Sequence, residues 1–303
     1  MQDVIRIENL TKNYGKIKAV DNLSFKVKEG ELFAFLGVNG AGKSTTISAM
    51  CRAISKDSGK IYIDGKDIDE DANVIQQKFG VVFQTSVLDK SLSVYQNLKH
   101  RASLYGIIGD EFDKRLEEID SLLDIKELLD RTFGKLSGGQ KRKIDVARAL
   151  INDPKILILD EPTTGLDPQT RTIMWQAVNK LRKEKNLTVF LTTHYMEEAA
   201  DADYVVIIDG GKISAEGTPH QLKTTYTGDF ITLYGVLEEQ VKQLNKEYLK
   251  VGNTFRIKVD NTREASKLII EHPDIFVDYE TAKGKMDDVF LAVTGKSLTE
   301  DKQ

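Results

Sequence analysis

The 303-residue chain has little cysteine, tryptophan or proline, with one, one and five of these residues. The single cysteine, Cys51, excludes a disulfide within the chain and is typical of a protein in a reducing compartment. No apolar run approaches the about 20 residues that a membrane-spanning helix needs, and the N-terminus does not read as a secretory signal. If the protein acts at a membrane, we expect another subunit to span it.

An excess of positive charge is also missing. The chain has 43 Lys and Arg against 47 Asp and Glu, a formal net charge of −4, so electrostatics does not favour nucleic acid as the main partner. A hydrophobic fraction of 40% and a charged fraction of 30% are typical of a globular protein with a sizeable core. The length allows one large domain and a smaller one.

Residues 37–45 read Gly-Val-Asn-Gly-Ala-Gly-Lys-Ser-Thr and match the phosphate-loop pattern G-x-x-x-x-G-K-[ST]. Glycines at 37, 40 and 42 let the backbone turn so that its N–H groups form a nest for an anion, and a helix that begins near Lys43 adds its dipole. The pattern predicts that Lys43 contacts the β- and γ-phosphates and that Ser44 coordinates Mg²⁺. The residues expected to hold the nucleotide are Gly37, Asn39, Gly40, Ala41, Gly42, Lys43, Ser44 and Thr45.

The alternative is a chance glycine turn. The context disfavours it, because the apolar run 31–36 predicts a buried strand before the loop and 45–54 can continue as a helix. Tyr14, in Asn-Tyr-Gly at 13–15, can stack on an adenine or pack against the neighbouring glycine, and spacing alone leaves both open.

The order of the predicted elements indicates an α/β core. Strands over 4–8 and 18–27 predict a small antiparallel sheet, and Gly59–Asp64 with the turn Asp64-Gly65 predicts a hairpin. Apolar runs predict the buried strands of a parallel sheet, with helices between them. These strands are 79–84, 155–160, 187–192 and 203–209, and the predicted helices are 92–131, 168–184 and 196–202.

Past about residue 220 the pattern changes. Strands over 230–234, 254–259 and 275–280, with helices over 237–247 and 262–271, carry no phosphate-binding motif. We therefore expect a separate small α+β domain. The predicted boundaries are 1–222 for the nucleotide-binding domain, with a helical subdomain at about 86–150, and 223–303 for the C-terminal domain.

Polar residues follow three of the predicted strands at their carboxyl ends, where ligands of open α/β sheets bind. Asp160 is expected to help hold Mg²⁺, which prefers oxygen ligands, and Glu161 to polarise the attacking water. Gln84 can touch metal and water, and His194 can hydrogen-bond the γ-phosphate. The alternative for Asp160-Glu161 is a solvated turn, which we disfavour because an aspartate directly after an apolar run is otherwise costly to place.

Leu136-Ser-Gly-Gly-Gln140 is a second candidate anion nest, followed by a predicted helix from Lys141. One triphosphate cannot easily use two such loops of one subunit. We therefore expect each loop to serve the nucleotide of a different subunit.

These motifs together resemble the ATP-binding subunits of ATP-binding-cassette (ABC) transporters over residues 4–220. The resemblance includes the Walker A loop, the Q-loop glutamine, the Leu-Ser-Gly-Gly-Gln signature, the Walker B strand with its glutamate, the D-loop and the switch histidine, in the family's order. The corresponding residues are 37–45, Gln84, 136–140, 156–161, 165–167 and His194, and Tyr14 matches the adenine-stacking aromatic.

The resemblance implies an ABC nucleotide-binding fold, with an α/β core, an antiparallel β subdomain and a helical subdomain, and a head-to-tail homodimer with two ATP-Mg²⁺ between the subunits. Ser137, Gly139 and Gln140 of one copy would complete the site of the other, and Asp167 would cross the interface. Glu161, His194, Gln84 and Lys43 would be the catalytic residues, and Ser44, Gln84 and Asp160 the metal ligands.

Residues 163–171, 193–199 and the tail 286–295 resemble the daunorubicin-resistance and multidrug exporter branch, although Gln140 stands where many of its members carry methionine. This implies an ATPase at the cytoplasmic face of the membrane that drives export of a drug, antibiotic, ion or lipid or polysaccharide through separate permease subunits, contacted near 85–97. The C-terminal domain is expected to support dimerisation or regulation. The alternative is a soluble ABC ATPase acting on ribosomes or DNA, but one cassette and no heptad run disfavour it.

Overall fold

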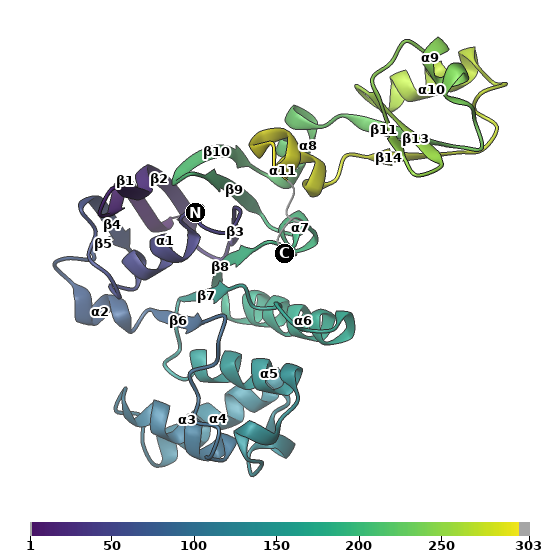
Figure 1. Ribbon diagram of the computed structural model, residues 1–303. Helices are drawn as coiled ribbons and strands as arrows, with labels where there is room; N and C mark the ends of the chain where they lie inside the picture. The colour runs from purple at the N-terminus through teal and green to yellow at the C-terminus, as the bar shows by residue number, and fades with distance from the viewer. Residues whose placement is uncertain (1, 297–303) are drawn as a thin grey trace. The chain divides into compact units, whose positions relative to one another are not determined.

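The structure is a computed structural model that describes residues 2–296 (Figure 1). The chain divides into two compact units, one of Met1–Tyr195 with Ala202–Ser214 and the other of Met196–Asp201 with Ala215–Gln303. The division does not fall at one point of the chain, because a short helix after Tyr195 belongs to the second unit. The functional boundary near residue 222 stays a prediction.

A four-stranded antiparallel sheet in the first unit has the order β2-β1-β4-β5. Its hairpin between β4 and β5 turns at Asp64 and Gly65, whose φ angles of 51° and 79° are typical of a two-residue type I′ turn, so this predicted turn is confirmed. The strands are β1 Asp3–Tyr14, β2 Ile17–Lys28, β4 Ser58–Ile63 and β5 Lys66–Asp67.

A six-stranded sheet carries the order β10-β9-β3-β8-β7-β6, and the pairs β9–β3, β3–β8, β8–β7 and β7–β6 are parallel. The α/β prediction is therefore confirmed. Because β3, β7 and β8 are adjacent and parallel, the segments that follow them emerge at one edge of the sheet. The strands are β3 Leu32–Leu36, β6 Phe79–Val82, β7 Ile156–Asp160, β8 Thr188–Thr193, β9 Tyr204–Asp209 and β10 Lys212–Gly217.

Phenylalanine contacts join these two sheets. Phe25 of β2 lies with its ring centroid 5.3 Å from those of Phe33 and Phe35 in β3, and Phe33 lies 5.3 Å from Phe190 in β8. Such pairs add to the apolar burial that fixes β3, and with it the start of the loop that follows. Cys51 packs against the same core, and burial raises the pKa of its thiol to about 12, which favours packing over a redox role.

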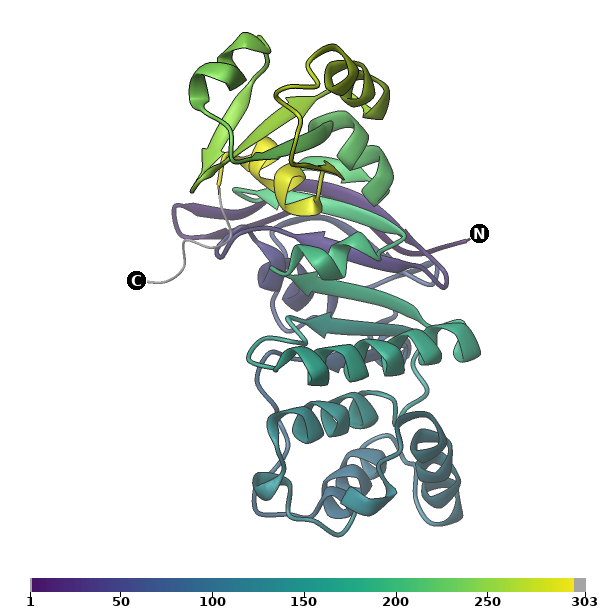
Figure 2. The ribbon, with the colours of Figure 1, turned by 90° about the vertical axis from the view of Figure 1, so that its right-hand side faces the viewer.

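Helix α1 packs through Ile47, Ala49 and Met50 into the core that the antiparallel sheet shares with the parallel sheet, and α6 covers the parallel sheet elsewhere (Figure 1). Figures 1 and 2 show α6 between the sheet and helices α4 and α5, and α6 contacts both of these helices. The helices are α1 Lys43–Met50, α2 Ala72–Gln76, α3 Val94–Ser103, α4 Asp110–Leu123, the 3₁₀ turns η1 Lys126–Leu128 and η2 Phe133–Lys135, α5 Gly138–Ala149 and α6 Pro168–Lys185.

One predicted helix is wrong in its extent. The stretch 92–131 is broken after α3, because Gly106 and Gly109 have φ angles of 78° and 56°, and it is broken again where Asp124 ends α4 at φ 49°. An apolar period alone does not exclude such breaks, since it continues on both sides of them.

The second unit contains a βαββαβ sheet in the order β12-β13-β11-β14, with helices α9 and α10 between its strands, and also the helices α7, α8 and α11. The strand predicted over 275–280 is wrong: Ile275 and Phe276 are buried in a connecting segment, and the strand is β14. The elements are α7 Met196–Ala200, α8 Pro219–Tyr226, β11 Asp229–Tyr234, α9 Glu238–Gln243, β12 Tyr248–Val251, β13 Thr254–Val259, α10 Thr262–Glu271, β14 Tyr279–Lys283 and α11 Met286–Thr294.

Within residues 2–296, no helix combines the length and the apolar composition that crossing a membrane requires.

Candidate nucleotide site

The phosphate loop leaves β3 and ends at the first residue of α1. Gly40 and Gly42 have φ angles of 79° and 109°, and a Cβ on Gly42 would lie 2.5 Å from the carbonyl oxygen of Ala19, so both positions require glycine. No side chain caps α1, which leaves its first N–H groups for an anion. Around the loop, Gly37 and Ala41 are buried, Thr45 is half-buried, and Asn39, Gly40 and Ser44 are exposed.

Lys43 is folded back into this loop. Its Nζ donates hydrogen bonds to the carbonyl oxygens of Gly37 at 2.7 Å and Val38 at 3.3 Å. A bound phosphate would offer the ammonium group a charged acceptor, which makes a stronger hydrogen bond than a carbonyl. The side chain is therefore held at the loop, where the sequence predicts it.

Asp160 is the last residue of β7, and its Oδ1 accepts a hydrogen bond of 2.6 Å from the hydroxyl of Thr192 in β8. Burial raises the pKa of the Asp160 carboxyl, and the charge of Glu161 raises it further, against the opposing effects of Thr192, Lys43 and Arg142. A poorly solvated carboxylate beside a phosphate loop gains from a cation, which fits its predicted place as a Mg²⁺ ligand.

Glu161 brings three of the predicted catalytic side chains together. Its Oε2 accepts a 3.0 Å hydrogen bond from Nε2 of Gln84 and lies 3.6 Å from Nδ1 of His194. The backbone of Glu161 is left-handed at φ 46°, and its N–H donates to the carbonyl oxygen of Thr192 at 3.0 Å. Such a conformation is uncommon for a residue with a side chain and clusters at functional sites.

Arg142, which the sequence reasoning missed, holds this turn from α5. Its guanidinium donates hydrogen bonds to the carbonyl oxygens of Phe83, Asp160, Glu161 and Pro162. The side chain is buried, and it joins the segment after β6 to the segment after β7. Its position in α5 does not stand out in the sequence, because Asp145 and Arg148 are also buried charges of this helix.

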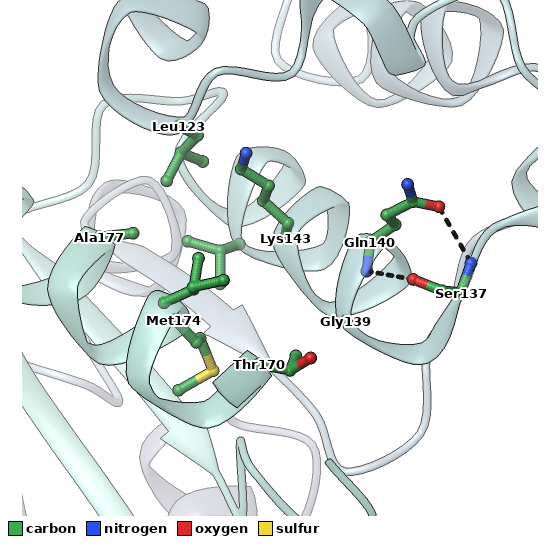
Figure 3. A pocket seen from close by; sticks show the side chains of 10 residues that line it. Leu123, Ser137, Gly139, Gln140, Lys143, Thr170, Met174 and Ala177 are labelled. Atoms are coloured by element: carbon green, nitrogen blue, oxygen red, sulfur yellow. Dashed lines mark hydrogen bonds between the residues drawn. The ribbon is translucent and has the colours of Figure 1, made fainter. Parts of the chain in front are cut away.

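The signature turn has a structural role within its own subunit. Ser137 caps α5: its hydroxyl accepts from the N–H of Gln140 at 3.3 Å, and the Gln140 side chain accepts from the N–H of Ser137 at 3.1 Å (Figure 3). Asp167 caps α6 by accepting from the N–H and the hydroxyl of Thr170 at 2.9 and 2.6 Å. The signature turn and α1 lie in different parts of the first unit (Figure 1).

A pocket of about 210 Å³ lies between helices α5 and α6. Figure 3 shows the side chains of Lys143, Met174 and Leu123 around it. Near their N-termini the two helices are in close contact, at Gly139 of α5 and Thr170 of α6. A Cβ on Gly139 would lie 2.3 Å from Cγ2 of Thr170, whereas a Cβ on Gly138 would lie 3.8 Å from Cδ2 of Leu166.

We therefore expect Gly139→Ala to lower the free energy of unfolding by about 1–3 kcal/mol through overpacking, with no loss for Gly138→Ala. Thermal unfolding of the nucleotide-free chain measures both. Thr170→Ser removes the clashing methyl group, so it should recover part of the loss when combined with Gly139→Ala. Equal unfolding temperatures for the two single variants would contradict this packing argument.

Tyr14 lies at the end of β1 with 50% of its surface exposed, and Nζ of Lys12 is 5.5 Å from its ring centroid. The ring is therefore accessible to a stacking base. Its assignment to adenine stays a prediction, as do the roles of the other site residues.

The raised pKa of Asp160 gives a prediction for stability. A carboxyl whose pKa is higher in the folded state costs stability at neutral pH, and this cost disappears as pH falls below the unfolded pKa of about 4. Asp160→Asn keeps an acceptor for Thr192 and should raise the unfolding temperature of the nucleotide-free chain by a few degrees at pH 7. The gain should shrink towards pH 4; an unchanged or lower unfolding temperature at pH 7 would contradict it.

Comparison with known proteins agrees with these features. A family model described as ABC transporter matches residues 20–164. The Nod factor export ATP-binding protein I of Cupriavidus metallidurans is 35% identical over 305 residues, which cover 98% of this chain and 99% of the relative. Among solved structures, cbiO1 from Clostridium perfringens, part of the ABC transporter complex cbiONQ, has a TM-score of 0.69 and 31% identity over 74% of this chain and 92% of its own.

A second solved structure is the dimer of an ATP-binding cassette in a post-hydrolysis state, bound to ADP and Pi. It has a TM-score of 0.64 and 28% identity, over 71% of this chain and 98% of its own. The family hydrolyses ATP, with Mg²⁺ as the usual metal. From its phosphate loop, its paired carboxylates and its full-length similarity to export ATP-binding proteins, the chain belongs to the ATP-binding subunits of ABC transporters.

Proposed function

We propose that this ATPase subunit drives export through separate membrane-spanning subunits, and that two copies close head to tail on two ATP molecules. One observation supports the dimer. The phosphate loop before α1 and the signature turn before α5 are both formed, but they lie in different parts of the first unit, so one nucleotide would contact the two loops of different copies (Figure 1). The relatives named for export support the export role, and the dimeric cassette supports the dimer.

In this proposal the chain's oxygen atoms hold the metal. The Ser44 hydroxyl, the Gln84 amide oxygen and the Asp160 carboxylate would be ligands, and Mg²⁺ when bound neutralises charge on the β- and γ-phosphates. Glu161 would orient the attacking water, because its carboxylate already lies between Gln84 and His194. The residues of the partner copy that face the nucleotide would be Ser137, Gly139, Gln140 and Asp167.

The membrane partner would be a separate permease, contacted near residues 85–97, with this subunit peripheral at the cytoplasmic face of the membrane. The cargo classes of the exporter branch are drugs, antibiotics, ions, lipids and polysaccharides. The relatives are named for Nod factor export, so a Nod factor is a compound to assay first. The daunorubicin-type branch, suggested by the tail at 286–295, and a dimerising or regulatory role for residues 223–303 also stay proposals.

A soluble ABC ATPase that acts on ribosomes or DNA is not favoured, because the relatives are export subunits. Affinity purification of the tagged full chain from detergent-solubilised membranes tests the proposal. Stoichiometric recovery of a polytopic membrane protein, whose presence stimulates ATP hydrolysis, is the expected result. Recovery of ribosomes or DNA instead would overturn it.

Lys43→Ala should weaken ATP binding at least tenfold, since it removes a charge-assisted hydrogen bond to phosphate worth about 1.5–3 kcal/mol. Isothermal titration with ATP and Mg²⁺ measures this loss. Lys141→Ala, which removes the same charge from the surface of α5, is the matched control and should leave the affinity unchanged. Equal affinities of wild type and Lys43→Ala would contradict the role of Lys43.

A further inference from the structure

The imidazole of His194 is held beside Glu161 by an aromatic ring and not by hydrogen bonds. Its Nδ1 lies 3.6 Å from Oε2 of Glu161, which is longer than a hydrogen bond, and the imidazole makes no hydrogen bond within residues 2–296. Its ring centroid lies 4.2 Å from that of Tyr195, with 38° between the two planes. The contact that fixes the place of the histidine is therefore the one with Tyr195.

Tyr195 is itself fixed by two groups. Its backbone N–H donates a 2.9 Å hydrogen bond to the hydroxyl of Thr193, the buried last residue of β8, and this short turn sets the direction of the chain after the strand. The guanidinium carbon of Arg171, near the start of α6, lies 3.9 Å from the centre of the tyrosine ring. A cation over an aromatic ring is attracted by its π electrons, most strongly where water is excluded.

The tyrosine ring is the partner that explains the position of Arg171. The Nε of this arginine is buried without a hydrogen-bond partner, and among the residues that the structure describes the guanidinium forms no ion pair. A buried donor without an acceptor is costly, so the arginine does not serve the local hydrogen bonding of α6. It lies one helical turn after Asp167, which caps α6 and faces the partner copy in the proposed function.

We propose that Tyr195 and Arg171 are positioning residues for ATP hydrolysis. Arg171 holds the tyrosine ring, and the ring holds His194 where it meets the γ-phosphate next to Glu161. The inference rests on the proposed function and adds two residues to it. The alternative is ordinary packing of a ring between β8 and α6, which would stabilise the fold without setting the place of the histidine.

The first experiment observes His194 in the nucleotide-free chain by NMR. The chain has four histidines, and the imidazole signal that disappears in His194→Gln is that of residue 194. A ring at 4.2 Å shields this imidazole, so Tyr195→Leu should move the signal downfield, and Tyr195→Phe should keep it near its wild-type position. The control Tyr62→Leu removes the ring of another arginine stack, with Arg6 at 4.3 Å, and should not move the signal.

The second experiment measures ATP hydrolysis. Tyr195→Leu should lower kcat about tenfold or more and leave the affinity for ATP within about twofold, because a small displacement of His194 affects the reaction and not the phosphate loop. Tyr195→Phe, which keeps the ring, should restore most of the rate that Tyr195→Leu loses. Tyr62→Leu should hydrolyse ATP at the wild-type rate.

The third experiment tests whether Arg171 acts through the ring. Arg171→Met removes the cation and should lower kcat about threefold, as expected for the loss of one cation–π contact, and Arg171→Lys should lower it less. In the Tyr195→Leu chain, Arg171→Met should cause no further loss, because the two side chains act as one unit.

The outcomes distinguish this inference from the proposed function. Wild-type turnover in His194→Gln would overturn the role of His194 in the proposed function, and this inference with it. If His194→Gln loses turnover, three results would overturn the inference alone: wild-type kcat in Tyr195→Leu, an unmoved His194 signal, or additive losses for Tyr195→Leu and Arg171→Met. Should Tyr195→Leu unfold near the assay temperature, Arg171→Met decides, and a wild-type kcat for that variant would overturn the inference.

Discussion

Glu161→Gln is expected to lower the turnover of ATP by about 10²-fold or more while the chain still binds ATP and Mg²⁺. The amide keeps the size of the carboxylate and the contacts with Gln84 and His194, which lie at 3.0 and 3.6 Å from Oε2. It removes the charge that orients and polarises water, and it leaves the phosphate loop untouched. Steady-state phosphate release and ATP affinity, measured on the same preparation, separate these effects.

The matched control is Glu197→Gln, an acid-to-amide change on α7 outside the proposed site. It should hydrolyse ATP at the wild-type rate. Wild-type turnover in Glu161→Gln would refute the role of Glu161, and a loss of ATP affinity equal to the loss of turnover would show that the residue acts in binding.

Arg142→Met is expected to lower the free energy of unfolding by about 3 kcal/mol or more and to abolish most of the ATPase activity. The guanidinium donates to the carbonyl oxygens of four residues, and an apolar side chain leaves these buried or partly buried acceptors unsatisfied at up to about 1–3 kcal/mol each. Because three of these carbonyls belong to the turn that carries Asp160 and Glu161, activity should fall even where the chain stays folded. Denaturant unfolding and turnover at a temperature well below the transition measure the two losses.

Lys141→Met removes a positive charge from the neighbouring position of α5 and should change neither quantity by much. Arg142→Lys keeps the charge but cannot reach four acceptors, so it should be intermediate in stability. If Arg142→Met unfolds and hydrolyses ATP like Lys141→Met, the turn does not depend on this side chain.

Some features of the site could be predicted from the sequence, and others could not. The meeting of Gln84, Glu161 and His194 was predictable, because polar residues after adjacent parallel strands emerge at one edge of a sheet. Arg142 was not found, because its acceptors are backbone atoms of two distant segments, and no sequence pattern records carbonyl positions. The left-handed backbone of Glu161 is likewise imposed by tertiary contacts.

Two other differences between prediction and structure had signals in the sequence. Ser137 and Gln140 fit the capping-box spacing, so the structural role of the signature turn was available beside its nucleotide role. Gly106 and Gly109 mark the break between α3 and α4. The run at 275–280 was ambiguous, since Ile275 and Phe276 pack into the core of the second unit without joining the sheet, and a short apolar run does not distinguish these cases.

The most direct test of the account is the solution mass of the Glu161→Gln chain, measured by light scattering with and without ATP and Mg²⁺. We expect the mass to double when ATP is added, and the same chain carrying Lys43→Ala to keep the monomer mass. We also expect Ser137→Arg, at the turn that would meet the partner's triphosphate, to prevent the doubling without preventing ATP binding. A Glu161→Gln chain that binds ATP yet keeps the monomer mass, with and without its membrane subunit, would contradict the account.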